Sequence, residues 1–307
     1  MKRLVTRSDF DGLVCAMILK ELKIIDEIKF VHPKDVQDGK VELSKNDITT
    51  NLPFDPRVGL SFDHHESELI RLKNVDTSKL IIDGNAKSAA RVVYNYYGGK
   101  EKIKAVSEEI MTAVDKGDSA DFTVDEILEP SGWVLLNYIM DARTGLGRFR
   151  EFRISNYDLM MELIDYCMNH PIDEILRLPD VKERVDLYFE QANLFKEQLK
   201  RIVKIDNKVA VLDLRGEDVI YAGNRFMIYA LYPTIEISVH VAWGFKKQNT
   251  AVMIGKSIVN KNSKFDIGAL CLSYGGGGHQ NAGTCQLEND KVDQELPNIL
   301  DKLNGRK

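Results

Sequence analysis

Residues 3–22, RLVTRSDFDGLVCAMILKEL, decide the fold of the first part of the chain. Residues 3–6 are typical of a short buried strand and residues 12–22 of a helix, so the acidic turn between them joins a strand to a helix. In open α/β folds, ligands bind at the carboxyl ends of the strands. We therefore expect the carboxylates of Asp9 and Asp11 to face one volume there. Taken alone, such a turn is more often a helix cap followed by glycine.

The first hundred residues continue this alternation of short apolar runs and amphipathic stretches. Further strands are predicted at residues 28–32, 48–52, 58–62 and 80–83, and a helix at residues 86–97. Strands that alternate with helices favour a mostly parallel sheet covered on both sides. Apolar residues recur at spacings of three and four further on, which predicts helices at residues 103–114, 133–140 and 157–168.

The last third of the chain has a different organisation. Residues 181–203 keep a helical period without glycine or proline, which indicates a long connecting helix. After residue 206 apolar and polar residues alternate, as they do in strands. The predicted fold class is therefore α/β, with a mostly parallel sheet flanked by helices in residues 1–180, a helical connector in residues 181–205 and a smaller α/β domain in residues 206–307.

The chain is mildly acidic, with 42 Lys and Arg against 47 Asp and Glu in 307 residues and a net charge of −5. This balance excludes a protein that coats duplex nucleic acid with a basic surface, but it is compatible with a local basic cleft for a short anionic substrate. The N-terminus lacks a signal-peptide core. The longest uncharged apolar run near it, residues 13–19, is far shorter than the roughly 20 residues of a membrane span. We expect a cytoplasmic protein without a membrane segment.

Two further motifs have the chemistry of metal ligands. Asp63, His64 and His65 come directly after the strand predicted at residues 58–62, and imidazole with carboxylate suits Mn²⁺, Zn²⁺ or Fe²⁺ better than Ca²⁺. Asp115 follows the helix predicted at residues 103–114, where a carboxylate opposes the helix dipole. A bound cation would compensate that charge, and a polar solvent-exposed turn is the equally weighted alternative.

A run of glycines in the last part of the chain predicts a binding loop. Four consecutive glycines precede His279 and Asn281, and glycine lets backbone N–H groups approach an anion closely. A flexible loop is the alternative for a glycine run by itself. The residues predicted to contact substrate in this part of the chain are Gly276, Gly277, Gly278, His279, Asn281, Arg225 and Ser257.

Together these motifs resemble, in order and spacing, those of the DHH phosphoesterase superfamily with its DHH-associated C-terminal domain. The glycine run before His279 is similar to the Gly-Gly-Gly-His signature of that second domain. The resemblance covers nearly the whole chain. It is strongest to the branch of nanoRNases, pAp phosphatases and cyclic-dinucleotide phosphodiesterases, also labelled exopolyphosphatase-related.

The resemblance implies a pair of Mn²⁺ ions at the mouth of the first sheet, with Mg²⁺ or Co²⁺ as alternatives. It implies that residues 1–180 form the metal-binding catalytic domain and that residues 206–307 bind substrate, with hydrolysis between them. The metal ligands that it implies are Asp9, Asp11, His64 and Asp115. Asp63 would orient a neighbouring imidazole and His65 would face the scissile phosphate. A homodimer is compatible with the resemblance.

Two departures from the family pattern affect the number of ions. Relatives carry His-x-Asp-x-Asp where this chain has Arg7, and arginine cannot coordinate a cation, so Arg7 would contact phosphate or replace the charge of the first ion. Relatives also place a bridging aspartate at the end of the preceding strand. Asn51 ends that strand here and Asp47 lies four residues earlier, about 13 Å along an extended chain. Asn51 is the candidate bridge if the preceding strand is residues 48–52, and Asp47 is the candidate if that strand is residues 41–43, so one or two ions are expected.

These observations predict a metal-dependent hydrolase, a phosphodiesterase that acts on short nucleotides such as oligoribonucleotides, linear or cyclic dinucleotides, or pAp. The acidic net charge favours a substrate of a few nucleotides over a long strand. One alternative is an exopolyphosphatase-like phosphatase. The other is a non-catalytic nucleotide-binding sensor, which the two departures at Arg7 and Asn51 motivate.

Overall fold

The computed structural model describes residues 2–306 except residues 66–67, 69–71 and 74. The chain forms two compact units. The first consists of Met1–Phe122 and Pro130–Leu187, and the second of Thr123–Glu129 and Tyr188–Lys307. Among the described residues, no helix combines the length and apolarity needed to cross a bilayer.

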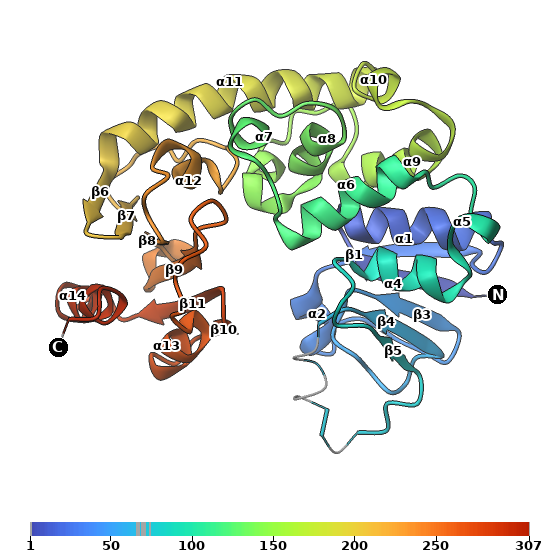
Figure 1. Ribbon diagram of the computed structural model, residues 1–307, viewed down its shortest axis with the longest axis horizontal. Coiled ribbons are helices and arrows are strands. Elements are labelled where there is room, and N and C mark those ends of the chain that lie inside the picture. The colour runs from blue at the N-terminus through green and yellow to red at the C-terminus, as the bar shows by residue number, and fades with distance from the viewer. Residues whose placement is uncertain (1, 66–67, 69–71, 74, 307) are drawn as a thin grey trace. The chain divides into compact units, whose positions relative to one another are not determined.

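The first unit is built on a five-stranded parallel sheet with the order β2-β1-β3-β4-β5 (Figure 1). Its strands are β1 (Arg3–Arg7), β2 (Glu27–Val31), β3 (Asp47–Thr50), β4 (Leu60–Asp63) and β5 (Leu80–Ile82). Arg7 is paired with Val31, and Thr50 with Phe62, so the carboxyl ends of the central strands meet at one edge. This edge collects the side chains that follow each strand.

Helices of the first unit surround the sheet, and most of them bury apolar residues against it or against one another. They are α1 (Phe10–Glu21), α2 (Pro33–Gln37), α4 (Ala89–Tyr96), α5 (Gly99–Lys102), α6 (Glu108–Ser119), α8 (Gly132–Met140), α9 (Asn156–Asn169), α10 (Ile172–Ile175) and the first part of α11 (Pro179–Ile202). Two 3₁₀ turns, η1 (Ala142–Thr144) and η2 (Leu146–Arg148), follow α8.

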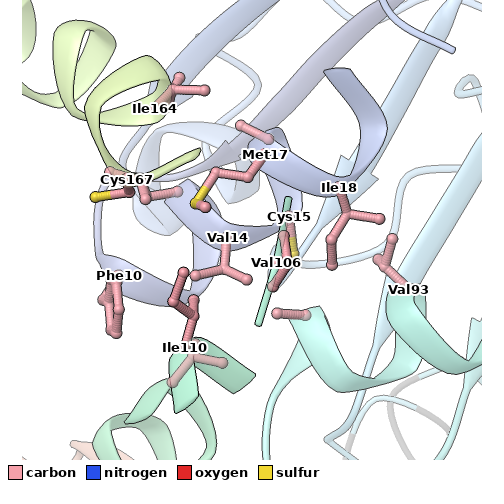
Figure 2. Packing of buried hydrophobic residues seen from close by; sticks show 14 of the residues in the cluster. Phe10, Val14, Cys15, Met17, Ile18, Val93, Val106, Ile110, Ile164 and Cys167 are labelled. Atoms are coloured by element: carbon pink, nitrogen blue, oxygen red, sulfur yellow. The ribbon is translucent and has the colours of Figure 1, made fainter. Parts of the chain in front are cut away.

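The central helix α1 is buried over its first ten residues. Figure 2 shows Val14 and Met17 of α1 among side chains from neighbouring helices, including Ile110 of α6 and Ile164 of α9. A smaller apolar cluster that includes Val5 covers the opposite face of the sheet, whereas the adjacent Leu4 belongs to the α1 cluster. Both faces are therefore buried, as expected for parallel strands.

The second unit contains a mixed six-stranded sheet with the order β10-β11-β9-β8-β7-β6. Its strands are β6 (Val203–Asp206), β7 (Val209–Asp213), β8 (Ile237–Trp243), β9 (Thr250–Lys256), β10 (Gly277–His279) and β11 (Ala282–Leu287). Its helices, besides the second part of α11, are α7 (Val124–Leu128), α12 (Met227–Leu231), α13 (Ile267–Ser273) and α14 (Val292–Leu303), and the short η3 (Phe245–Lys247) follows β8. The predicted α/β fold class is confirmed, as is the mostly parallel first sheet.

Two local predictions were wrong. The helix predicted at residues 103–114 is α6, which begins after Ser107, whose side chain accepts a hydrogen bond from Ile110 N, and continues to Ser119. Ala120 ends it in a left-handed conformation with φ 54°. The predicted glycine loop is the antiparallel hairpin of β10 and β11, because the backbone of residues 277–279 pairs with that of residues 282–284.

Candidate active site

Asp9 and Asp11 open α1 directly after β1. Asp9 is the N-cap, and its Oδ1 accepts a hydrogen bond from Gly12 N at 3.0 Å. A Cβ on Gly12 would lie 2.0 Å from the carbonyl oxygen of Arg7, so only glycine allows this close return of the helix onto the strand. The turn that the sequence predicted is therefore fixed by backbone packing.

The Asp11 carboxylate is buried and held on several sides. Its oxygens accept hydrogen bonds from the backbone of Ala89 at 3.2 Å and Ala90 at 2.7 Å, at the start of α4, and from Asn51 Nδ2 at 2.7 Å. Burial raises the pKa of Asp11 well above its ordinary value, and the nearby charges of Asp118 and Asp9 raise it further. A buried carboxylate in this condition favours a cation beside it.

His64 and Asp118 complete a group with Asp11. His64 Nε2 lies 2.8 Å from Asp118 Oδ2, and one ligand atom from each of Asp11, His64 and Asp118 lies within 4.8 Å of the others. Burial lowers the pKa of His64, but Asp118 and Asp63 outweigh it and hold the pKa above its ordinary value. Burial likewise raises the pKa of Asp118, but His64 and the more distant Arg7 hold it below its ordinary value.

The three residues fit a divalent metal ion. His64 Nε2 is buried and makes no well-directed hydrogen bond, even though Asp118 is close. A ring nitrogen in this position is suited to donate its lone pair to a metal, and one imidazole with two carboxylates suits Mn²⁺ or a similar ion.

Asp63 orients the next histidine. Its Oδ1 accepts hydrogen bonds from His64 N at 2.7 Å, His65 N at 3.1 Å and His65 Nδ1 at 2.8 Å. A carboxylate on Nδ1 fixes the ring and leaves Nε2 of neutral His65 as the basic nitrogen. The His65 side chain is about half exposed, at 47%, so that nitrogen belongs to a ring that solvent and ligands reach.

Asp115 is not in this group. Its Oδ1 accepts a hydrogen bond from Ser88 Oγ at 2.7 Å, and its Oδ2 accepts one from Arg91 Nε at 2.8 Å. The aspartate of α6 that lies beside His64 is Asp118, which the sequence patterns did not single out. Because α6 continues past Asp115, the residue three positions later lies on a neighbouring part of the helix surface and reaches His64 instead. The signal was the pair of aspartates three apart on one helix.

The bounds of β3 show where the two candidate bridging residues, Asn51 and Asp47, lie. Residues 41–43 form no strand, and β3 begins at Asp47, whose carboxylate accepts hydrogen bonds from Arg3 at 2.8 and 3.0 Å at the amino end of the sheet. Asp47 therefore lies outside the Asp11, His64 and Asp118 group and is bonded to Arg3 instead. Asn51 follows the last residue of β3 and donates a hydrogen bond to Asp11, so an amide lies beside the Asp11 carboxylate at this edge of the sheet.

Arg7 ends β1 and pairs with Asp9, its Nε lying 2.8 Å from Asp9 Oδ2. Burial raises the pKa of Asp9 above its ordinary value, although the Arg7 charge opposes the rise. Asp9 is outside the Asp11, His64 and Asp118 group, because its oxygens are turned to Gly12 and Arg7. Both Arg7 and Asp9 line a cavity of about 480 Å³ within the first unit.

The residues of the second unit that were predicted to contact substrate differ in their surroundings. Gly276 and Gly278 pack against the backbone of β11, where an added Cβ would lie 2.1 and 2.3 Å from carbonyl oxygens. Gly277, in contrast, has no atom within 4 Å of a Cβ position. His279 Nδ1 accepts a hydrogen bond from Asn281 N at 3.3 Å across the turn. These glycines therefore serve the hairpin except at residue 277, where the backbone is open.

The other two predicted contacts belong to loops of the second unit. The guanidinium of Arg225 lies 4.2 Å from the ring centre of Phe226, and its charge acts on His240 of β8. Ser257 is buried, and its Oγ accepts hydrogen bonds from the backbone of Val259 at 3.2 Å and Asn260 at 2.9 Å. Ser257 therefore shapes the turn after β9.

Comparison with solved structures finds a relative that matches the full length. The pGpG-specific phosphodiesterase PggH from Vibrio cholerae is 54% identical, the alignment covers 100% of both chains, and the TM-score is 0.88. CDC45 from Entamoeba histolytica shares 9% identity over 98% of this chain and 95% of that one, with a TM-score of 0.50, and so resembles it in fold alone. No protein-family model matches the chain, and no curated protein matches it either.

The comparison with this relative and the motifs of this chain indicate the same family. An identity of 54% over the full length comes with an aspartate turn after β1 and an Asp-His-His run at the end of β4. The chain belongs to the DHH phosphoesterase superfamily and is a hydrolase of phosphoesters.

Proposed function

We propose that the chain hydrolyses the phosphodiester bond of a short linear dinucleotide, with pGpG as the foremost substrate, and that it requires a divalent metal ion. The observation that carries the proposal is the group of Asp11, His64 and Asp118, whose ligand atoms lie within 4.8 Å of one another. The relative with 54% identity is named for activity on pGpG, which supports the choice of substrate.

Asp11, His64 and Asp118 are the residues proposed to hold the ion, with Mn²⁺ preferred and Mg²⁺ or Co²⁺ as alternatives. When bound, such an ion supplies positive charge at the phosphate and lowers the pKa of water toward neutrality. One ion is expected, because Arg7 cannot coordinate a metal and Asn51 replaces a bridging carboxylate.

The neighbouring side chains are proposed to act on the phosphate and its proton. His65, held through Nδ1 by Asp63, presents Nε2 to accept or return a proton. Arg7 adds positive charge beside Asp9 and is proposed to contact a nonbridging phosphoryl oxygen, where charge develops in the transition state. Gly277 in the second unit is proposed to let backbone groups approach the far phosphate.

The proposal extends to the organisation of the protein. Residues 1–180 would form the metal-binding catalytic domain, residues 181–205 the connecting helix, and residues 206–307 the substrate-binding domain. We also propose a homodimer and a cytoplasmic location. Light scattering of the purified chain measures its oligomeric state, and a monomer would contradict the homodimer. Fractionation of the producing cells measures its location, and a membrane-bound pool would contradict the cytoplasmic location.

A substrate panel tests the function. The purified chain is stripped of metal with EDTA and assayed on pGpG, cyclic diguanylate, pAp and inorganic polyphosphate after addition of Mn²⁺, Mg²⁺ or Co²⁺. We expect turnover of pGpG only with metal, and its loss in Asp118→Asn. The matched control is Asp186→Asn, an exposed aspartate that pairs with Lys182 in a surface ion pair of little energetic weight.

The alternatives predict different results from the same panel. Cleavage of polyphosphate alone would overturn the nucleotide assignment in favour of a polyphosphatase. Tight binding of pGpG without turnover under any metal would identify a sensor. Equal turnover before and after removal of metal would contradict the metal requirement.

A further inference from the structure

The cavity that adjoins Asp9 has no role in the chemistry described so far. It has a volume of about 480 Å³, lies entirely within the first unit and falls within the size range of small-molecule sites. One end is formed by Arg7, Ser8 and Asp9, next to the residues proposed to act on phosphate. The other lining residues include the start of α9 and the turn after α8, whose Arg143 is near enough for its charge to act on Asp9.

Much of the cavity wall is apolar and aromatic. Its lining includes Phe30 of β2, Met140 of α8, and Tyr157, Leu159 and Met160 of α9. The Tyr157 ring meets the Phe30 ring edge to face, with 6.1 Å between ring centres and an interplanar angle of 81°. Tyr157 nevertheless remains 45% exposed, so a large aromatic surface on a supported ring faces solvent. A flat aromatic ligand would cover that surface.

The start of α9, which carries Tyr157, is held by the buried Arg184. Arg184 is 2% exposed, donates through Nε to Asn156 Oδ1 at 3.0 Å and donates to Ile154 O at 2.8 Å. Its guanidinium also lies 4.0 Å from the ring centre of Phe152. These contacts hold the first turn of α9 in place, so the cavity wall is rigid before any ligand arrives.

Two charged groups face each other at the polar side of the cavity. Arg143 donates from Nε to Asp141 at 2.7 and 3.0 Å, and both residues line the cavity. Within the described part of the chain, these are the hydrogen bonds of the Arg143 side chain, which leaves its two terminal nitrogens as donors for a ligand. Arg143 is 46% exposed, so the donors are accessible.

We propose that this cavity is a nucleobase subsite that selects guanine, an inference that rests on the proposed dinucleotide hydrolase. The base stacks on Tyr157, Arg143 donates to the O6 atom, and the Asp141 carboxylate meets the N1–H and the exocyclic amine. Adenine presents the reverse pattern, with a donor toward Arg143 and an acceptor toward Asp141, so it leaves both charged groups mismatched. A pyrimidine covers less of the Tyr157 ring.

The placement of the subsite suits the substrate. Because Arg7, Ser8 and Asp9 form one end of the cavity, a nucleotide whose base fills it carries its phosphate toward that end. Base binding then also orients the phosphate, so loss of stacking affects the reaction as well as affinity.

The test measures kcat/KM for pGpG, pApA, inosine dinucleotide and an abasic dinucleotide analogue in which both bases are replaced by hydrogen. We expect the wild type to prefer pGpG to pApA. Tyr157→Leu should lower kcat/KM for pGpG by about ten- to a hundredfold, with a far smaller change on the abasic analogue. Asp141→Asn, which keeps the cap on Arg143 N, should reduce the preference for pGpG over pApA by at least about tenfold.

Matched controls separate the subsite from general damage. Tyr96 is also largely exposed, at 51%, but lies beside Phe62 rather than the cavity, so Tyr96→Leu should leave the pGpG to pApA ratio unchanged. Arg148→Ala is the control for Arg143→Ala, because Arg148 lies in the adjacent turn η2 and does not line the cavity. Tyr157→Phe keeps the ring and should keep the activity.

The outcomes distinguish this inference from the function on which it rests. If the wild type hydrolyses no dinucleotide with any metal, the proposed function fails and the subsite with it. If it hydrolyses pGpG but Tyr157→Leu and Arg143→Ala behave like their controls, the function stands and the subsite is refuted. Equal losses on pGpG and the abasic analogue would assign these residues to the phosphate and also overturn the base subsite.

Discussion

Asp118 Oδ2 lies 2.8 Å from His64 Nε2, which joins the last turn of α6 to the residue after β4. One turn earlier on the same helix, Asp115 is paired with Arg91 at 2.7 Å. These two aspartates, three positions apart on α6, therefore have different partners and different roles. Asp118 faces the residues proposed to bind metal, and Asp115 ties α6 to α4.

This difference predicts opposite effects of two similar substitutions. Asp118→Asn should weaken Mn²⁺ binding by at least about 100-fold and abolish the Mn²⁺-dependent rise in melting temperature. Asp115→Asn should keep metal affinity within about threefold and cost about 1–3 kcal/mol of unfolding free energy, because Arg91 loses its charged partner. Calorimetric titration with Mn²⁺ and urea unfolding measure the two quantities. The reverse assignment of effects would return Asp115 to the metal group.

A substitution at Asn51 should trade stability for metal affinity. Asn51→Asp would replace the 2.7 Å amide hydrogen bond to Asp11 by a second buried carboxylate, and Asn51 has a φ of 52° that aspartate tolerates. Without metal, we expect the unfolding free energy to fall by about 2 kcal/mol or more. With Mn²⁺, affinity should rise by at least about tenfold, because an acceptor replaces a donor beside the ion.

The control for this exchange is Asp47→Asn, at the opposite end of β3. It breaks the ion pair with Arg3, so it should lower stability and leave Mn²⁺ affinity unchanged. Unfolding in EDTA and Mn²⁺ titration of both variants check these outcomes. An Asn51→Asp protein with unchanged metal affinity would show that residue 51 does not face the ion.

The glycines of β10 allow binding and folding to be separated. Gly277→Ala has open space around the new Cβ, so it should change the unfolding free energy by less than about 0.5 kcal/mol. It should raise KM for pGpG by about tenfold if a phosphate approaches the backbone there. Gly278 has a φ of 154°, and its Cβ would lie 2.3 Å from Ala282 O, so Gly278→Ala should distort the hairpin and destabilise the chain. An unchanged KM in a stable Gly277→Ala protein would exclude this contact.

The second unit should lose stability in weak acid through His240. Burial, with a further contribution from Arg225, lowers the pKa of His240 to about 4. Because the folded-state pKa lies below the unfolded value of about 6.5, the unfolded chain takes up the proton first. The contribution is therefore fully present above about pH 6.5 and is lost as the pH falls toward 4. It amounts to about 2 kcal/mol between pH 7.5 and 5.0.

His240→Gln isolates this effect from the titration of carboxylates. Urea unfolding of both proteins at pH 7.5 and 5.0 gives the difference in pH dependence. We expect the variant to lose about 2 kcal/mol less than the wild type over that interval. Parallel pH dependence in the two proteins would mean that His240 titrates normally.

The sheet of the first unit was predictable because its signals are local. Each strand is a short apolar run, and the side chains that follow a run must lie at the carboxyl edge if the strands are parallel. This reasoning brought Asp11 and His64 to one edge without coordinates, whereas the oxygens of Asp9, expected beside them, are turned to Gly12 and Arg7. It also indicated Asn51, but only as one of two alternatives.

The other features of the site could not be read from the periodicity of apolar residues. Gly117 is a weak helix former, so the pattern favoured an end of α6 before Asp115, whereas tertiary packing extends the helix to Ser119. Because the helix was predicted to end more than one turn too early, Asp115 was expected at the site where Asp118 lies. Glycines have no side chains whose polarity could alternate, so the sequence does not indicate a strand at residues 277–279. These residues form a strand because their backbone pairs with that of β11. The cavity beside Tyr157 depends on segments far apart in the sequence.

Arg7 and Asn51 each stand at the tip of a strand whose interior residues are packed beneath them. Exchanging either side chain alters what the edge can coordinate and leaves the backbone pairing of the strand that carries it in place, even where, as in Asn51→Asp, it lowers the unfolding free energy. Lineages that share this scaffold can therefore gain or shed a cation, or move to another phosphorylated molecule, through one or two codon changes, and a designer has the same freedom.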